Sequence, residues 1–154
     1  MKYQTFLLFG APGSGKGTQG KTLGTIPRYY HCACGDVFRS IDTLVLDGIP
    51  RNVGQAKIMN EMIDVKKVFH LACPDRETLF YRLKKRALKE NRLDDANEEV
   101  IQRRLDIYEK ESRPVLSFYS KELITVVDAI QPPVKVLLDI LESVNDGAYE
   151  SAAV

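Results

Sequence analysis

Residues 10–18 read GAPGSGKGT, and they contain the residue types needed to bind a chain of phosphates. Glycines let backbone N–H groups approach phosphate oxygens without an intervening Cβ, and a helix that starts here adds the positive end of its dipole. Lys16 supplies a charge that can follow the β- and γ-phosphates. The strict pattern has a hydroxyl directly after the lysine, whereas here Gly17 comes first and Thr18 follows. The segment still predicts a phosphate-binding loop.

A carboxylate and several arginines could complete the chemistry of such a loop. Asp47 ends an apolar run, and a parallel sheet presents the carboxyl ends of its strands to a ligand. A carboxylate there can hold the water shell of Mg²⁺. Arginine forks bind two phosphate oxygens at once. The candidates are the arginines at positions 39, 51, 82, 86, 92, 103, 104 and 113, of which we assign Arg82, Arg103 and Arg113 to solvated helix faces.

Five short apolar runs must position these residues, namely 3–10, 28–34, 43–48, 67–74 and 123–129. Each is nearly continuous and ends at a turn residue, which is typical of strands buried on both faces of a parallel sheet. Segments 74–90 and 96–119 have helical spacing, and Asp95 is the expected N-cap of the second. The sequence predicts an α/β fold with a doubly wound parallel sheet of about five strands and helices on both faces.

Composition sets the class of protein. A chain of 154 residues with 44% hydrophobic and 28% charged residues is expected to form one core, at 1–144, with a flexible tail at 145–154. The net charge of +1 favours neither nucleic acid nor a membrane surface. Three cysteines indicate a reduced, cytoplasmic protein. His31, Cys32 and Cys34 lack a fourth ligand for zinc, so we expect them to pack in a strand.

The chain resembles the adenylate kinases over nearly its whole length. The segments GAPGSGKGT, GDVFR, LVLDGIPRNVGQA, RLKKRALKENRLDD and EEVIQRRLDIYEKESRPVLSFY occur in the family's order. The resemblance implies transfer of the γ-phosphoryl group from Mg-ATP to AMP, giving two ADP, with ATP, AMP and ADP as its partners in a monomer. Only seven residues separate Arg86 from Asp94, so the lid, at about 87–95, resembles the short form without zinc.

The resemblance also assigns site residues. It implies that ATP is held by Gly13, Ser14, Gly15, Lys16, Gly17, Thr18, Arg86 and Gln131. It implies that AMP is held by Cys34, Arg39, Gly48, Ile49, Pro50, Arg51, Gln55, Arg92 and Arg104. Lys16, Arg92 and Arg104 would be catalytic, and Asp47 would bind Mg²⁺ through water. The family commonly has threonine where Cys34 stands.

One segment of the family pattern is missing between Ser40 and Ile41. In the family, a small helical subdomain that closes over AMP follows GDVFR. Here only eight residues lie between Cys34 and Thr43, whereas a parallel crossover with its helix needs at least ~10–12. The segment could have been removed by engineering or splicing, or it could be naturally absent. A third alternative is that the sequence is joined across residues that were never observed.

Two other functions stay open at this point. A chain without the acceptor subdomain could be a module that binds ATP and transfers phosphate to AMP poorly or not at all. The shared loop and arginines also fit a kinase for another nucleoside monophosphate, such as UMP, CMP or GMP, although Gln55 leans towards adenine. The alternatives differ in the acceptor, so the comparison of ADP formation with and without AMP separates them.

Overall fold

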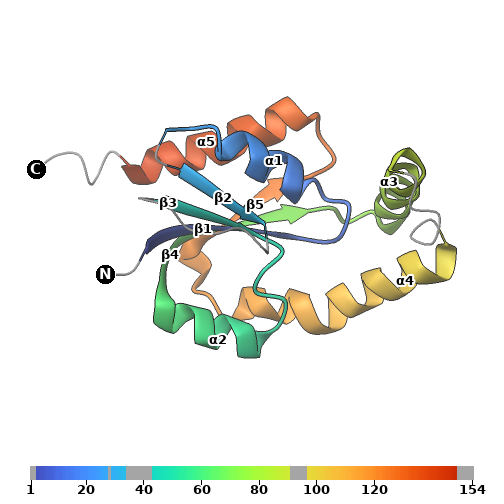
Figure 1. Ribbon diagram of the computed structural model, residues 1–154, viewed down its shortest axis with the longest axis horizontal. Coiled ribbons are helices and arrows are strands. Elements are labelled where there is room, and N and C mark those ends of the chain that lie inside the picture. Colours follow the sequence, from blue (N-terminus) through green and yellow to red (C-terminus); the bar gives the residue numbers. More distant parts are fainter. Residues whose placement is uncertain (1–2, 28, 34–42, 91–96, 149–154) are drawn as a thin grey trace, which may run out of the picture.

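The computed structural model describes residues 3–27, 29–33, 43–90 and 97–148, and a five-stranded sheet forms its centre (Figure 1). The strands are β1 (Tyr3–Gly10), β2 (Tyr29–Ala33), β3 (Thr43–Asp47), β4 (Ile63–Ala72) and β5 (Ile124–Asp128). Their order in the sheet is β2-β3-β1-β4-β5, and every neighbouring pair is parallel. The predicted parallel sheet of about five strands is confirmed.

Helices cover both faces of this sheet (Figure 1). On one face lie α1 (Lys16–Leu23) and α5 (Pro133–Ala148). The other core is built with α2 (Val53–Met62), α3 (Arg76–Lys89) and α4 (Glu98–Ile107). A π-helical turn at Tyr108–Ser112 and 3₁₀ turns at Arg113–Ser117 and Lys121–Leu123 lead from α4 to β5. None of the described helices is long and apolar enough to cross a membrane.

The strands form because their side chains are buried on both faces in alternation. In β1, Leu7 and Phe9 enter the core beneath α2, α3 and α4, whereas Leu8 enters the core beneath α1 and α5. In β3, Leu44 lies in the first core and Val45 in the second. A strand with two buried faces carries hardly any polar residue, which is why these runs were recognisable in the sequence.

Three boundaries differ from the sequence predictions. Strand β4 begins at Ile63 rather than near residue 67, because α2 ends in extended backbone directly at Ile63. The N-cap of α4 is Asn97, whose side chain accepts from the N–H of Glu99, so the prediction of Asp95 was wrong. Helix α5 continues to Ala148, into the segment expected as a tail from residue 145.

Two ion pairs join α3 to α4. Arg76 pairs with Asp106 at 2.5 Å, and Lys84 pairs with Glu98 at 2.9 Å. Each pair is exposed, so each contributes little to stability by itself. Together they fix the two helices that flank the expected lid, most of which lies outside the described residues.

We predict that Phe69→Ala destabilises the fold by about 3–5 kcal/mol, because the ring is completely buried and its loss leaves a cavity. Phe69 packs edge-on against Phe6, with 6.0 Å between the ring centroids. Denaturation in urea measures the change. Val126→Ala is the control on the edge strand β5, where the side chain is 66% exposed, and should change stability by less than about 0.5 kcal/mol. Equal effects of the two substitutions would contradict this description of the core.

Candidate functional site

The glycine-rich loop joins the end of β1 to the start of α1. Gly15, the N-cap of α1, has a φ of 95°, a left-handed conformation that side chains disfavour. Gly10 lies so close to β4 that an added Cβ would be 2.6 Å from the carbonyl oxygen of Leu71. The loop therefore requires glycine for both conformation and space. Its last residues place the first N–H groups of α1, and the positive end of that helix, at the carboxyl edge of the sheet.

Ser14 holds a buried hydroxyl inside the loop. Its backbone N–H donates to the carbonyl of Ala11 at 3.1 Å, and the residue is 3% exposed. The Oγ has no hydrogen-bond partner among the described residues. A buried hydroxyl without a partner costs free energy, and a phosphate oxygen in the loop would supply one. The sequence prediction that this segment binds phosphate fits this observation.

Lys16 folds back over the same loop. Its Nζ donates to the carbonyl oxygens of Gly10 at 2.8 Å and Ala11 at 3.0 Å. Burial lowers the pKa of Lys16 from 10.5 to about 8. Asp47 opposes this change, whereas Arg51, Arg86 and Arg104 lower the pKa further. The ammonium group is held by two carbonyls in a cationic environment that favours an anion beside it.

The charges that act on Lys16 come from separate parts of the chain. Asp47 ends β3, Arg51 follows it before α2, Arg86 lies on α3 and Arg104 lies on α4. The fold therefore brings three of the sequence-predicted arginines and the predicted carboxylate to one end of the sheet. Like charges gathered around a partly buried lysine are unfavourable unless an anion compensates them.

The Asp47 carboxylate fits a magnesium site. In the register of the sheet Asp47 lies beside Leu8 of β1, directly below the glycine-rich loop. A Cβ placed on Gly17 would be 3.3 Å from its Oδ2, so this oxygen reaches the first turn of α1, next to Thr18. A carboxylate and a hydroxyl are oxygen ligands of the kind that Mg²⁺ takes, together with water and phosphate oxygens.

Residues 48–55 form a bonded unit beside this carboxylate. The Nε of Arg51 donates to the carbonyl oxygen of Gly48 at 2.9 Å. The backbone N–H of Arg51 donates to the Oε1 of Gln55 at 2.7 Å. The structure thus brings together Gly48, Arg51 and Gln55, three of the residues predicted on the acceptor side. Ile49 and Pro50, joined by a cis peptide bond, lie between them.

The remaining predicted residues are only partly within the described chain. The Nε of Arg86 donates to Glu90 at 2.9 Å on the exposed side of α3, and Arg104 is exposed on α4. Both are near enough to lower the pKa of Lys16. Cys34, Arg39 and Arg92 lie outside the described residues, so their predicted roles stay predictions.

Arg82 is a residue that the sequence interpretation misplaced. We expected a solvated helix face, yet its Nη1 donates to the carbonyl oxygen of Ala129 at 2.7 Å and its Nη2 to that of Ile130 at 3.4 Å. Gln131, predicted near the base of ATP, follows directly and donates to Asp139. The four-residue spacing from Arg82 to Arg86 was the available signal, because it places both on the same side of α3.

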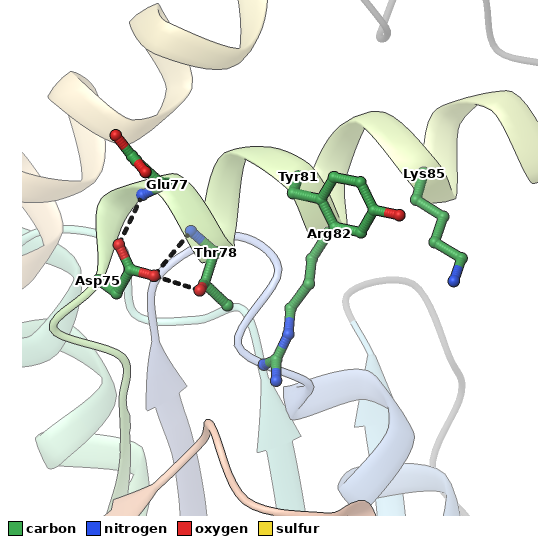
Figure 2. A pocket seen from close by; sticks show the side chains of 6 residues that line it. All are labelled: Asp75, Glu77, Thr78, Tyr81, Arg82 and Lys85. Atoms are coloured by element: carbon green, nitrogen blue, oxygen red, sulfur yellow. Dashed lines mark hydrogen bonds between the residues drawn. The ribbon is translucent and has the colours of Figure 1, made fainter.

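Figure 2 shows an open hollow along α3, lined by Asp75, Glu77, Thr78, Tyr81, Arg82 and Lys85. Asp75 caps the helix there by accepting from the N–H groups of Glu77 and Thr78. The hollow contains Arg82 but no residue of the glycine-rich loop. It also contains none of the charged residues that act on Lys16, so we do not assign phosphate binding to it.

We predict that the free chain binds ATP most tightly below about pH 8. Above its pKa Lys16 is neutral, so ATP binding must also protonate the lysine, which costs free energy. The affinity for ATP should therefore fall by up to about tenfold per pH unit. Calorimetric titrations with ATP at pH 7, 8 and 9 measure this dependence. The Lys16→Met variant is the control and should bind more weakly with little pH dependence. Identical pH dependence in both proteins would contradict the assignment to Lys16.

Known proteins of similar sequence were compared with the chain. No family model matches it. An adenylate kinase of a Cyanothece species is 31% identical over 185 residues, covering 90% of this chain and 94% of the relative. Those of Thermobifida fusca and Bacteroides thetaiotaomicron are 31% and 30% identical, covering 82% and 75% of this chain and 90% and 84% of the relatives.

The lengths of the matches are informative as well. The match to the Cyanothece protein runs over 185 residues, more than the 154 of this chain, so that relative has residues without a counterpart here. The glycine-rich loop, the carboxylate beside it and the arginines around it nevertheless all lie within one described fold. On the identity and coverage of these relatives, the chain belongs to the adenylate kinase family.

Proposed function

We propose that this chain catalyses reversible transfer of the γ-phosphoryl group of Mg-ATP to AMP, giving two ADP. The observation that carries the proposal is the convergence of Asp47, Arg51, Arg86 and Arg104 on Lys16 from separate elements. Phosphoryl transfer requires alignment of the two oxygens and neutralisation of charge, with little covalent chemistry by the protein. The relatives are named adenylate kinases, which favours AMP over other monophosphates as acceptor.

The donor side is assigned to the loop and to α3. Backbone N–H groups from Gly13 to Thr18 would bind the phosphates of ATP, and the hydroxyl of Ser14 would gain the partner that it lacks. Lys16 would leave the carbonyls of Gly10 and Ala11 for the β- and γ-phosphates. Arg86 would bind the same phosphates from α3. Gln131, and Arg82 through the backbone that it holds, would shape the site of the base.

Asp47 and Thr18 would hold the water shell of Mg²⁺ beside the loop. The ion, when bound, would neutralise charge on the β- and γ-phosphates. The chain's own contribution is to keep the carboxylate oxygen close to the first turn of α1, where the phosphates are expected. Because Asp47 partly offsets the burial of Lys16, it also keeps the lysine protonated at neutral pH.

The acceptor side is assigned to the bonded unit at residues 48–55. Arg51 would bind the phosphate of AMP, and its link to the carbonyl of Gly48 fixes the direction of the guanidinium group. Arg104 would lie between donor and acceptor and stabilise charge on the transferred group. The sequence adds Cys34, Arg39 and Arg92 to this set. No residue need act as a nucleophile, since the attacking oxygen belongs to AMP.

The connection between β2 and β3 limits this acceptor side. The two strands are parallel neighbours, with Ala33 beside Asp47 and Tyr29 beside Thr43. Only nine residues, 34–42, separate the two strands in the sequence, whereas a parallel crossover with a helix needs at least ~10–12 residues. We propose that this core, at 1–144, has no separate subdomain over the acceptor, so that AMP is bound weakly and water reaches the γ-phosphate.

We also propose a monomer in a reducing compartment such as the cytoplasm. The odd number of cysteines in the sequence supports a reduced protein. Cys73, which lies after β4, is a free thiol in the structure.

We predict that the chain forms ADP from ATP in an AMP-dependent reaction with an unusually high KM for AMP. A smaller rate of ADP formation should persist without AMP. In a core without a subdomain over the acceptor, water can react with the γ-phosphate in place of AMP. The measurement is ADP formation from Mg-ATP over a wide range of AMP, with UMP, CMP and GMP as alternative acceptors. If no acceptor stimulates ADP formation above the rate with water, the proposed kinase activity fails.

We predict that Arg104→Ala lowers kcat by about 10²–10³-fold, because it removes a cation that stabilises the charge on the transferred group. Arg103→Ala is a matched control: Arg103 is the next residue on α4, is also exposed, and is not among the charges that act on Lys16. It should change kcat less than about twofold. Equal losses in the two variants would show that α4, rather than the guanidinium of Arg104, was responsible.

A further inference from the structure

One side of helix α1 is lined by glycines, which have no side chains. Gly17, Gly20 and Gly24 follow one another at spacings of three and four residues, so they lie on the same side of the helix and its C-cap. Glycine is unfavourable inside a helix because it has the most backbone freedom to lose. A helix with glycines along one face therefore needs a reason in its packing.

The imidazole ring of His31 occupies this face. A Cβ on Gly20 would lie 2.3 Å from the Nε2 of His31 and 2.4 Å from its Cδ2. A Cβ on Gly24 would lie 2.6 Å from the Cβ of His31. All three distances are too short for a real contact between a Cβ and another atom. The backbone of α1 approaches β2 so closely that only glycine leaves room for the ring.

The same ring borders the carboxylate of Asp47. In the sheet His31 lies beside Val45, and Asp47 is two residues further along β3, so the two side chains emerge on the same face. The Nε2 of His31 is 3.9 Å from the Oδ2 of Asp47, and the two side chains are only 12% and 16% exposed. The same Oδ2 lies 3.3 Å from the position of a Cβ on Gly17.

We propose that His31 is a positioning residue for Asp47: through its ring nitrogen Nε2, which lies 3.9 Å from Oδ2, it holds the carboxylate against the first turn of α1. In that place the carboxylate lies against Gly17, at the end of the glycine-rich loop. The inference rests on the proposed function, in which Asp47 serves the magnesium ion of Mg-ATP. It also explains the glycine after Lys16, because a side chain at position 17 would displace the carboxylate from the side where the ion is needed.

The test compares two variants with a packing control. His31→Leu replaces the imidazole by an apolar side chain of similar size that has no nitrogen. It should raise the concentration of free Mg²⁺ needed for half-maximal rate by roughly tenfold, with little change in KM for ATP. His31→Gln, which restores a polar nitrogen, should recover part of this loss. Leu23→Ala is the control: Leu23 is buried on α1 and is absent from the site, so it should lower Tm without changing the Mg²⁺ requirement.

A second readout is independent of turnover. Mn²⁺, titrated into the complex of the chain with ATP and followed by electron paramagnetic resonance, should bind roughly tenfold more weakly to His31→Leu than to the unchanged chain. Gly17→Ala should weaken Mn²⁺ binding in the same way while leaving Tm equal or higher, since alanine favours helix more than glycine does. It tests the other contact of the carboxylate, with the first turn of α1, even if His31→Leu does not fold.

The possible failures are distinguishable. If the unchanged chain shows no acceptor-dependent ADP formation, the proposed function fails. If the unchanged chain is active, but His31→Leu and Gly17→Ala leave the Mg²⁺ requirement and Mn²⁺ affinity unchanged, then His31 only fills space and this inference is wrong. A lower Tm with unchanged metal dependence in His31→Leu has the same meaning.

Discussion

The parallel pairing of β1 with β3 is the constraint on which the rest of the site depends. It places Leu8 beside Asp47, so the loop that leaves β1 and the carboxylate that ends β3 emerge at one edge of the sheet. Neither group is near the other in sequence. On its other side β1 pairs with β4, which aligns Gly10 with Leu71 and so sets the position at which the loop begins. The positions of the glycine-rich loop and of Asp47 are thus set by backbone hydrogen bonds of the sheet, and the helices add arginines near them.

The same arrangement places several positive charges close together in the free chain, which is electrostatically unfavourable. Lys16 is partly buried near arginines from three other parts of the chain, and a single carboxylate opposes them. The loop carbonyls compensate the ammonium group in part, through two hydrogen bonds. The Ser14 hydroxyl is buried without a partner among the described residues. On the proposed function, an anionic ligand with several oxygens would relieve both of these conditions at once, so its binding would stabilise the chain.

The sequence predicted those parts of the structure that depend on short-range patterns. Leu7, Leu8 and Phe9 belong to a run with no polar residue, and such a run has few alternatives to a strand buried on both faces. The start of β4 was missed because Asp64 and Lys66 interrupt the apolar pattern there, although Val65 between them is buried in the core. Arg82 was misplaced because its partners, the carbonyls of Ala129 and Ile130, are backbone groups far along the chain. No local pattern shows a contact of that kind.

The glycine face of α1 also limits how this part of the chain can vary. At position 24 an added Cβ would meet both the Cβ and the backbone nitrogen of His31, so no change in the partner side chain makes room for it. At position 20 the obstacle is the imidazole ring alone, apart from a looser contact with Leu8. Alanine at 20 is therefore compatible only with a smaller residue at 31, and the two positions are expected to change together or not at all. Substitutions that are harmful one at a time would be tolerated as a pair, a form of epistasis set by the distance between one helix and one strand.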